Sequence, residues 1–205
     1  FLKMSPLFQR FDYLEIVDST NDYLKKIAKM GESRMVVAQE QTKGKGRFGH
    51  KWYSPSRQGL YVSYLFYPDW EVEKVCFLNI IAGLSVVNTV RKVGGDELSI
   101  KLKPPNDVYI SDKKVCGILS ETGSSDNRIN WAVVGIGVNL YHQEFPEELK
   151  SRATSLYLEG VNVSHPLVFC NHLTHQFERL YHRLEFDSWG IIKKEHNQYG
   201  HFKKG

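Results

Sequence analysis

A basic, glycine-rich stretch between two strand-like segments constrains the fold more than any other feature of the sequence. The stretch is Gln41–Pro55, in which glycines alternate with lysine, arginine and histidine. The segments on either side, 35–40 and 59–67, are rich in β-branched and aromatic residues, which favour strands. The pattern predicts a long basic loop that joins two consecutive strands and lies at a sheet edge or over a sheet face.

The three loop glycines also match the dinucleotide-binding pattern Gly-x-Gly-x-x-Gly, at Gly44, Gly46 and Gly49. That pattern is informative only where a helix follows it. Here a strand-like segment follows, so a dinucleotide fold is not indicated. The phosphate-loop pattern of nucleotide triphosphatases fails too, because Gly49 is followed by His50 and Lys51.

The composition of the loop predicts an anionic ligand. Glycine lets the backbone approach a ligand closely or take positive φ, and successive N–H groups can form a concave anion site. Lys43, Lys45 and Arg47 add cations that can make charge-assisted hydrogen bonds to phosphate or carboxylate. We expect the loop to be mobile when empty and ordered over its ligand; the alternative is a solvated connection without a ligand.

The bulk composition favours one domain of a soluble protein. The chain has 205 residues, a formal charge of +4 and three scattered cysteines without a Cys-x-x-Cys pair. This charge suits anionic ligands without requiring nucleic acid, and the cysteines favour reduced thiols in the cytoplasm. The most apolar run, Val75–Val90, contains polar residues and is short for a bilayer, so it predicts a buried helix and no membrane association.

Periodicity along the chain predicts an α+β fold. Short strands separated by turn residues form hairpins, which favours a mixed, largely antiparallel sheet with helices mainly on one face. Asp18 or Ser19 is expected to cap the first helix, and Gly31 to end it. Strands are expected at 8–17, 35–40, 59–67, 99–103, 108–110, 115–122 and 129–140, and helices at 22–29, 73–93, 146–150, 166–184 and 189–199.

Four polar segments could meet at one anion site: the helix start at 19–21, the glycine loop, 103–107, and a turn at 111–114. Lys114 precedes apolar residues, so its ammonium could lie at the rim of a cleft and neutralise a phosphoryl group. A solvated turn lysine is the alternative. Asn106 and Asp107 could bind a ligand or only form a local Asx-turn.

The sequence gives weaker support for a metal site, a general base or a serine nucleophile. His172, His175 and His182 share one helix face, where they could bind a metal or simply be solvated. Glu121 could act as a base, face solvent or pair with a lysine. No Gly-x-Ser-x-Gly motif indicates a serine nucleophile.

Taken in order, the motifs resemble those of biotin protein ligases. The resemblance covers most of Phe11–Tyr157 and is specific as an ordered set. It rests on Asp18-Ser-Thr-Asn21, Gln41-Thr-Lys-Gly-Lys-Gly-Arg-Phe-Gly-His-Lys-Trp52, Gly59-Leu-Tyr-Val-Ser63, Lys103-Pro-Pro-Asn-Asp107, Lys113-Lys-Val-Cys-Gly-Ile-Leu119, Val134-Gly-Ile-Gly-Val-Asn139 and Ala153-Thr-Ser-Leu156.

The resemblance implies a class II synthetase-like fold and a two-step reaction. Biotin and MgATP would form biotinyl-5′-AMP, and the biotinyl group would pass to a lysine of a biotin carboxyl carrier protein. It also implies a possible homodimer. Lys114 would bridge biotin and the α-phosphate, and Arg47 would retain the intermediate. Ser19, Thr20, Asn21, Gln41, Gly44, Lys45, Gly46, Arg47, Lys114 and Gly135 would bind biotin, and Trp52, Lys103, Asn106, Asp107 and Asn139 would bind ATP, with no metal ligand assigned.

The chain departs from the family pattern in three ways. Pro104 stands where the family usually has tryptophan, and Lys45 where arginine is also common. We expect a catalytic domain at 1–189 and a tail at 190–205, with the family's small C-terminal β-barrel domain absent or truncated. We also expect the DNA-binding module of repressor-type family members to be absent, and therefore no specific DNA partner. The rival functions are a lipoate or octanoate ligase or transferase, and a nucleic-acid-binding module that uses the basic loop.

Overall fold

A mixed seven-stranded sheet forms the centre of the computed structural model, which describes residues 7–105, 107–185 and 189–199. The strand order is β1-β2-β3-β7-β6-β5-β4, in which only β1 and β2 run parallel. The expected α+β fold with a largely antiparallel sheet is confirmed. The strands are β1 Arg10–Val17, β2 Arg34–Gln41, β3 Gly59–Phe66, β4 Ile100–Lys103, β5 Asp107–Ile110, β6 Lys113–Ser125 and β7 Arg128–Asn139.

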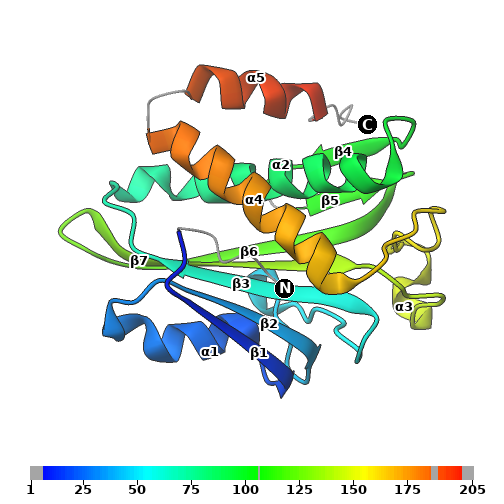
Figure 1. The fold of residues 1–205 in the computed structure, drawn as a ribbon, viewed down its shortest axis with the longest axis horizontal. Helices are drawn as coiled ribbons and strands as arrows, with labels where there is room; N and C mark the ends of the chain where they lie inside the picture. The colour runs from blue at the N-terminus through cyan, green and yellow to red at the C-terminus, as the bar shows by residue number, and fades with distance from the viewer. Residues whose placement is uncertain (1–6, 106, 186–188, 200–205) are drawn as a thin grey trace.

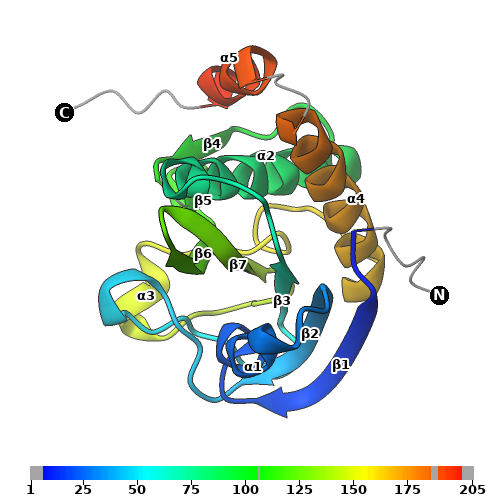
Figure 2. The same cartoon turned by 90° about the vertical axis from the view of Figure 1, so that its left-hand side faces the viewer.

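Helices lie mainly on one face of the sheet, as predicted (Figures 1 and 2). Side chains alternate between the two faces along a strand. Tyr64 of β3 stacks on Phe177 of α4 at 5.0 Å, whereas its neighbour Leu65 packs against Leu24 of α1 on the opposite face. The helical segments are α1 Thr20–Ile27, η1 Ala28–Met30, η2 Arg47–Gly49, η3 Val72–Lys74, α2 Val75–Gly94, α3 Glu147–Lys150, α4 Pro166–Glu185 and α5 Trp189–Tyr199.

The apolar run in the middle of the chain is a buried helix, α2, as predicted. By length and composition, Val72–Gly94 is the one helical stretch of the described residues that could cross a membrane, yet half of its most apolar window is buried within the fold. Leu78, Ile81 and Leu84 are fully buried in the main core between α2 and the sheet. Burial of apolar area of this kind is the main stabilising contribution to a domain core.

Turn chemistry determines where the elements end. Ser19 caps α1, and its hydroxyl accepts a hydrogen bond from Asp22 N at 3.4 Å. The turn expected at 111–114 is shorter than predicted: Ser111 and Asp112 both have positive φ, and β6 already begins at Lys113. Two residues with positive φ match the twist of the flanking strands, so both lysines belong to β6 rather than to a turn.

Candidate active site

Two rows of residues across the sheet form the floor of the candidate site, on the face that carries α1. Hydrogen-bond register places Ser63 opposite Gly135, and Gly135 opposite Leu119. The next row on the same face consists of Tyr61, Gly137, Gly117 and Asp107. Three glycines at neighbouring positions on this face leave space close to the sheet, and side chains from elsewhere in the chain enter it.

Asn21, at the start of α1, occupies the space above Gly135. A methyl group at position 135 would collide with Asn21 Oδ1, so the close approach requires glycine. Asn21 Nδ2 donates to Glu121 Oε2 at 2.8 Å and to the Leu119 carbonyl at 3.1 Å, and Ser63 Oγ lies 2.6 Å from Asn21 Oδ1. The amide is therefore held in one orientation over the floor.

Gln41, at the end of β2, joins α1 to the far end of the glycine loop. Its Oε1 accepts from Thr20 N at 2.9 Å and from Thr20 Oγ1 at 3.0 Å, while its Nε2 donates to Ser54 Oγ at 3.0 Å. Ser63 Oγ lies 2.7 Å from Thr20 Oγ1, and Ser19, Thr20 and Asn21 are buried. The side chains of Thr20, Asn21, Gln41 and Ser63, here called the neutral cluster, are donors and acceptors of the kind that suit a polar, uncharged ligand group.

Trp52 and Lys114 cover the second row of the floor. The Trp52 indole lies against Gly137 and Gly117, and its Nε1 is buried without a hydrogen-bond partner among the described residues. Lys114 Nζ lies 2.7 Å from Asp107 Oδ1 and 5.3 Å from the centroid of the Trp52 ring. A carboxylate and an aromatic face thus hold one ammonium group beside the neutral cluster.

The main chain of the glycine loop is largely committed to internal hydrogen bonds. The N–H groups of Thr42, Lys43, Gly46 and Trp52 donate to chain carbonyls at 2.7–2.9 Å. Among the loop glycines only Gly49 has positive φ. The predicted concave N–H site is therefore not formed by these four donors, and the positive charge of the loop comes from its side chains.

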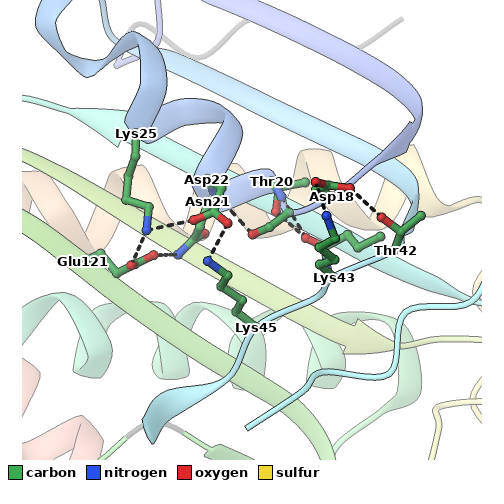
Figure 3. Close-up of polar contacts among 11 residues, drawn as sticks. Asp18, Thr20, Asn21, Asp22, Lys25, Thr42, Lys43, Lys45 and Glu121 are labelled. Atoms are coloured by element: carbon green, nitrogen blue, oxygen red, sulfur yellow. Dashed lines mark hydrogen bonds and ion pairs between the residues drawn. The ribbon is translucent and has the colours of Figure 1, made fainter. Parts of the chain in front are cut away.

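The loop cations pair with carboxylates at the start of α1 (Figure 3). Lys43 Nζ lies 3.0 Å from Asp18 Oδ2, and Lys45 Nζ lies 2.6 Å from Asp22 Oδ2. Hydrogen bonds from Thr42 and Lys43 lower the pKa of the Asp18 carboxyl. The two ion pairs thereby attach the loop to the start of α1, next to the neutral cluster.

The contacts of the remaining predicted residues are made with other parts of the chain. Asn139 is buried, and its Nδ2 donates to the Thr154 carbonyl at 2.9 Å. Lys103 Nζ lies 5.1 Å above the Tyr109 ring, and Arg47 lies 4.6 Å from the Phe48 ring. Asn106 lies outside the described residues, so its predicted role has no structural description.

The histidines of α4 do not converge on a metal site in the part of the chain that the structure describes. No group of three or more His, Cys, Asp or Glu side chains that could hold an ion occurs among those residues. His172 Nδ1 lies 3.1 Å from Lys92 Nζ, and His182 Nε2 lies 3.9 Å from Glu178 Oε1. Glu121 pairs with Lys25 at 2.5 Å, which confirms the lysine-pairing alternative for this residue.

Comparison with known sequences decides the family of the chain. Residues 13–139 match the Biotin/lipoate A/B protein ligase family. The chain belongs to this family. Among characterised members, the bifunctional ligase/repressor BirA of Bacillus spizizenii is 35% identical over 159 residues, which are 76% of this chain and 48% of that protein.

Other family members agree in sequence and in fold. The biotin–[acetyl-CoA-carboxylase] ligase of Mycobacterium tuberculosis is 31% identical over 75% of this chain and 57% of its own length. The biotin protein ligase of Aquifex aeolicus, solved in complex with biotin and ATP, superimposes with a TM-score of 0.77 at 34% identity, covering 94% of this chain and 79% of that chain. The chain spans about half the length of the BirA proteins of the two Bacillus species that it matches.

Sequence reasoning missed several residues at the site of this biotin/lipoate ligase family member. Ser63 contacts both Thr20 and Asn21, and its signal was a lone hydroxyl within the otherwise apolar and aromatic strand β3. Asp22 and Lys25 also contribute contacts. Asp22 is an acidic residue in the first turn of a helix, which is ordinary. Neither Asp22 nor Lys25 carried a sequence signal for its pairing.

Proposed function

We propose that the chain contains the catalytic domain of an ATP-dependent biotin protein ligase. It would form biotinyl-5′-AMP and pyrophosphate from biotin and ATP, and then transfer the biotinyl group to a lysine of a biotin carboxyl carrier protein. The observation that carries the proposal is the adjacency of two groups on one sheet face. The neutral cluster, which includes Ser63, Thr20 and Asn21, lies one row from Lys114 and Trp52.

The first step requires two anions to approach each other. A carboxylate oxygen of biotin attacks the α-phosphorus of ATP, the bond from that phosphorus to the bridging oxygen breaks, and pyrophosphate leaves with the electron pair. Lys114 is proposed to bridge the two anions, with Lys45 and Arg47 adding positive charge from the loop. Fixed cations directed at developing charge are usually the largest single contribution to such catalysis.

The second step is acyl transfer. The neutral amine of the carrier lysine attacks the acyl carbon of the adenylate, the bond to the phosphate oxygen breaks, AMP leaves with that electron pair, and the amine nitrogen releases one proton to solvent as the amide forms. In this scheme Arg47 retains the reactive intermediate until the carrier arrives. Ser19, Thr20, Asn21, Gln41, Gly44, Lys45, Gly46 and Gly135 are proposed to surround biotin, and Trp52, Lys103, Asn106, Asp107 and Asn139 to lie at the nucleotide.

Mg2+ is proposed to enter the site with ATP. This ion typically uses one or two protein carboxylates together with phosphate oxygens and water. Asp107, which lies at the edge of the site beside Lys114, fits that limited requirement. When bound, the ion would neutralise phosphate charge.

The partners and boundaries follow from the same proposal. The carrier domain of a carboxylase is the proposed acceptor of the biotinyl group. A homodimer would form through the exposed edge of the sheet. The cytoplasm is the expected compartment. The domain division after residue 189 also remains a proposal. It falls at the start of α5, which packs on α2 through the buried Ile192 and through Asn88, whose Nδ2 donates to Glu195 Oε1 at 3.1 Å.

Biotin-dependent exchange of labelled pyrophosphate into ATP tests the first step directly. We expect exchange with biotin and none without it, and a rise in melting temperature with biotin that equimolar lipoate does not produce. Stabilisation by lipoate alone would assign the chain to the lipoate branch of the family. Absence of exchange with either acid, at a normal melting temperature, would contradict the proposal.

A further inference from the structure

A carboxylate on β6 fixes the orientation of the Asn21 amide above the floor (Figure 3). Asn21 Nδ2 donates to Glu121 Oε2 at 2.8 Å and to the Leu119 carbonyl at 3.1 Å. An ionised carboxylate and a carbonyl can only accept hydrogen bonds, so both protons of the amide must point towards β6. Asn21 Oδ1 therefore points the other way, towards Ser63, whose Oγ lies 2.6 Å from it.

The orientation of this amide determines where the neighbouring hydroxyl protons go. An amide oxygen cannot donate, so Ser63 must donate to Asn21 Oδ1. Ser63 Oγ also lies 2.7 Å from Thr20 Oγ1, so its single proton already serves two acceptors. The proton of Thr20 Oγ1 goes to Gln41 Oε1 at 3.0 Å. The protons of both hydroxyls are thus engaged within the neutral cluster.

The cluster therefore offers a ligand lone pairs rather than protons. Both protons of the Asn21 amide and the hydroxyl protons of Ser63 and Thr20 already have acceptors in the chain. The hydroxyl oxygens can still accept hydrogen bonds, which suits N–H groups of a ligand. The cyclic urea of biotin carries an N–H on each side of its carbonyl, whereas the dithiolane ring of lipoate carries none.

Glu121 has a second partner, and the two contacts use different oxygens. Its Oε1 lies 2.5 Å from Lys25 Nζ, while its Oε2 accepts from Asn21. Lys25 Nζ also lies 2.9 Å from Asp22 Oδ1, so the ammonium keeps a carboxylate partner if Glu121 is replaced. The ion pair and the contact with the amide can therefore be removed separately by mutation.

We infer that Glu121 is a positioning residue that makes the neutral cluster selective for N–H donors. The inference rests on the proposed function. Glu121 holds the Asn21 amide with its oxygen towards Ser63, and this oxygen engages the Ser63 proton. With the amide reversed, Ser63 would accept from Nδ2 and its proton would become available to a ligand carbonyl. The carboxylate on β6 thus determines which ligand groups the cluster accepts, without touching the ligand itself.

Hydrogen exchange of the Asn21 side-chain amide tests the first part of the inference without using activity or ligand. NMR of protein labelled with nitrogen-15 at asparagine measures the exchange of the two Nδ2 protons. We expect Glu121→Met, which removes the acceptor at nearly constant length, to accelerate exchange by about tenfold. Glu121→Gln retains an oxygen acceptor and should restore most of the protection. Exchange that is unchanged in Glu121→Met would overturn the inference.

Ligand selectivity tests the second part. The two ligands are biotin and its cyclic carbonate analogue, in which oxygen replaces both N–H groups, and calorimetry measures both dissociation constants. We expect Glu121→Met to weaken biotin binding by about tenfold and to change binding of the carbonate by less than about twofold. Glu121→Gln should retain most of the selectivity. Unchanged selectivity in Glu121→Met would overturn the inference.

Lys25→Met is the matched control, because it removes the ion pair and leaves the acceptor for Asn21 in place. This variant should keep the amide exchange rate and the selectivity within about twofold of the wild type. Equal losses in Lys25→Met and Glu121→Met would assign the effect to the ion pair and overturn the inference. If the wild type does not bind biotin, the proposed function fails, while amide exchange still decides whether Glu121 orients Asn21.

Discussion

Lys114 and Asp107 form an ion pair across adjacent strands, with Nζ 2.7 Å from Oδ1, although a hairpin turn separates them in sequence. The side chains are 28% and 19% exposed, so the pair is partly shielded from water. The Lys114 ammonium also lies 5.3 Å from the centroid of the Trp52 ring. This arrangement holds a cation over the second row of the floor, next to the neutral cluster.

Replacing Lys114 by alanine should abolish most adenylate formation. We expect pyrophosphate exchange to fall by about 10²–10³-fold, because the cation that offsets the repulsion between carboxylate and α-phosphate is lost. Circular dichroism should show an intact fold. Asp107→Asn keeps the lysine but removes its partner, and should lose less activity than Lys114→Ala. Near-normal exchange in Lys114→Ala would contradict the role assigned to this residue.

Replacing Arg47 by glycine should release the intermediate. We expect biotinyl-5′-AMP to escape and to label lysines on unrelated proteins, as detected by mass spectrometry of an added bystander protein. Arg57→Gly is the matched control, because it removes the same side chain outside the glycine loop at a residue whose φ of 59° suits glycine. Labelling that stays confined to the carrier lysine in Arg47→Gly would show that Arg47 does not retain the adenylate.

Replacing Gly135 by alanine should displace Asn21 from the floor. The added methyl group collides with the Asn21 amide, so we expect a loss of about 1–3 kcal/mol in unfolding free energy and weaker biotin binding. Adding Asn21→Ala to this variant should recover part of the lost stability, since the collision is removed. Strictly additive effects in chemical denaturation of the two single variants and the double variant would rule out the predicted collision.

The stability of the protein should depend on His142 at mildly acidic pH. This ring is buried and stacked on Phe145 at 4.9 Å, and burial lowers its pKa to about 4, while the Gln58 main chain acts in the opposite direction. The ordinary pKa is 6.5, so the unfolded chain takes up a proton before the folded one does. The contribution of the neutral ring is therefore complete above pH 6.5 and is lost as the pH falls towards 4.

His142→Phe preserves the stacking and removes the titration. Between pH 6.5 and 4, we expect this variant to lose up to about 3 kcal/mol less unfolding free energy than the wild type. Urea denaturation at several pH values measures the difference. Parallel pH profiles for the two proteins would show that the ring titrates with an ordinary pKa.

Local patterns predicted most of the elements because they depend on neighbouring residues. The alternation in 59–67 predicted β3, and the apolar run from Val75 predicted α2 as a buried helix. The turn before β6 was predicted two residues too long, because Lys113 and Lys114 are polar residues at a strand start and resemble turn residues in sequence.

The sequence alone determined the α+β class, the polar segments and the family, because periodicity and motif order can be recognised from the linear order of residues. Only the tertiary structure decided which residues meet. Strand register placed Gly117, Gly135 and Gly137 side by side, and the path of the loop brought Lys45 to Asp22 and Trp52 onto the floor. These contacts join residues about 20 to 85 positions apart, and they arise from the pairing of whole strands and the packing of side chains against them.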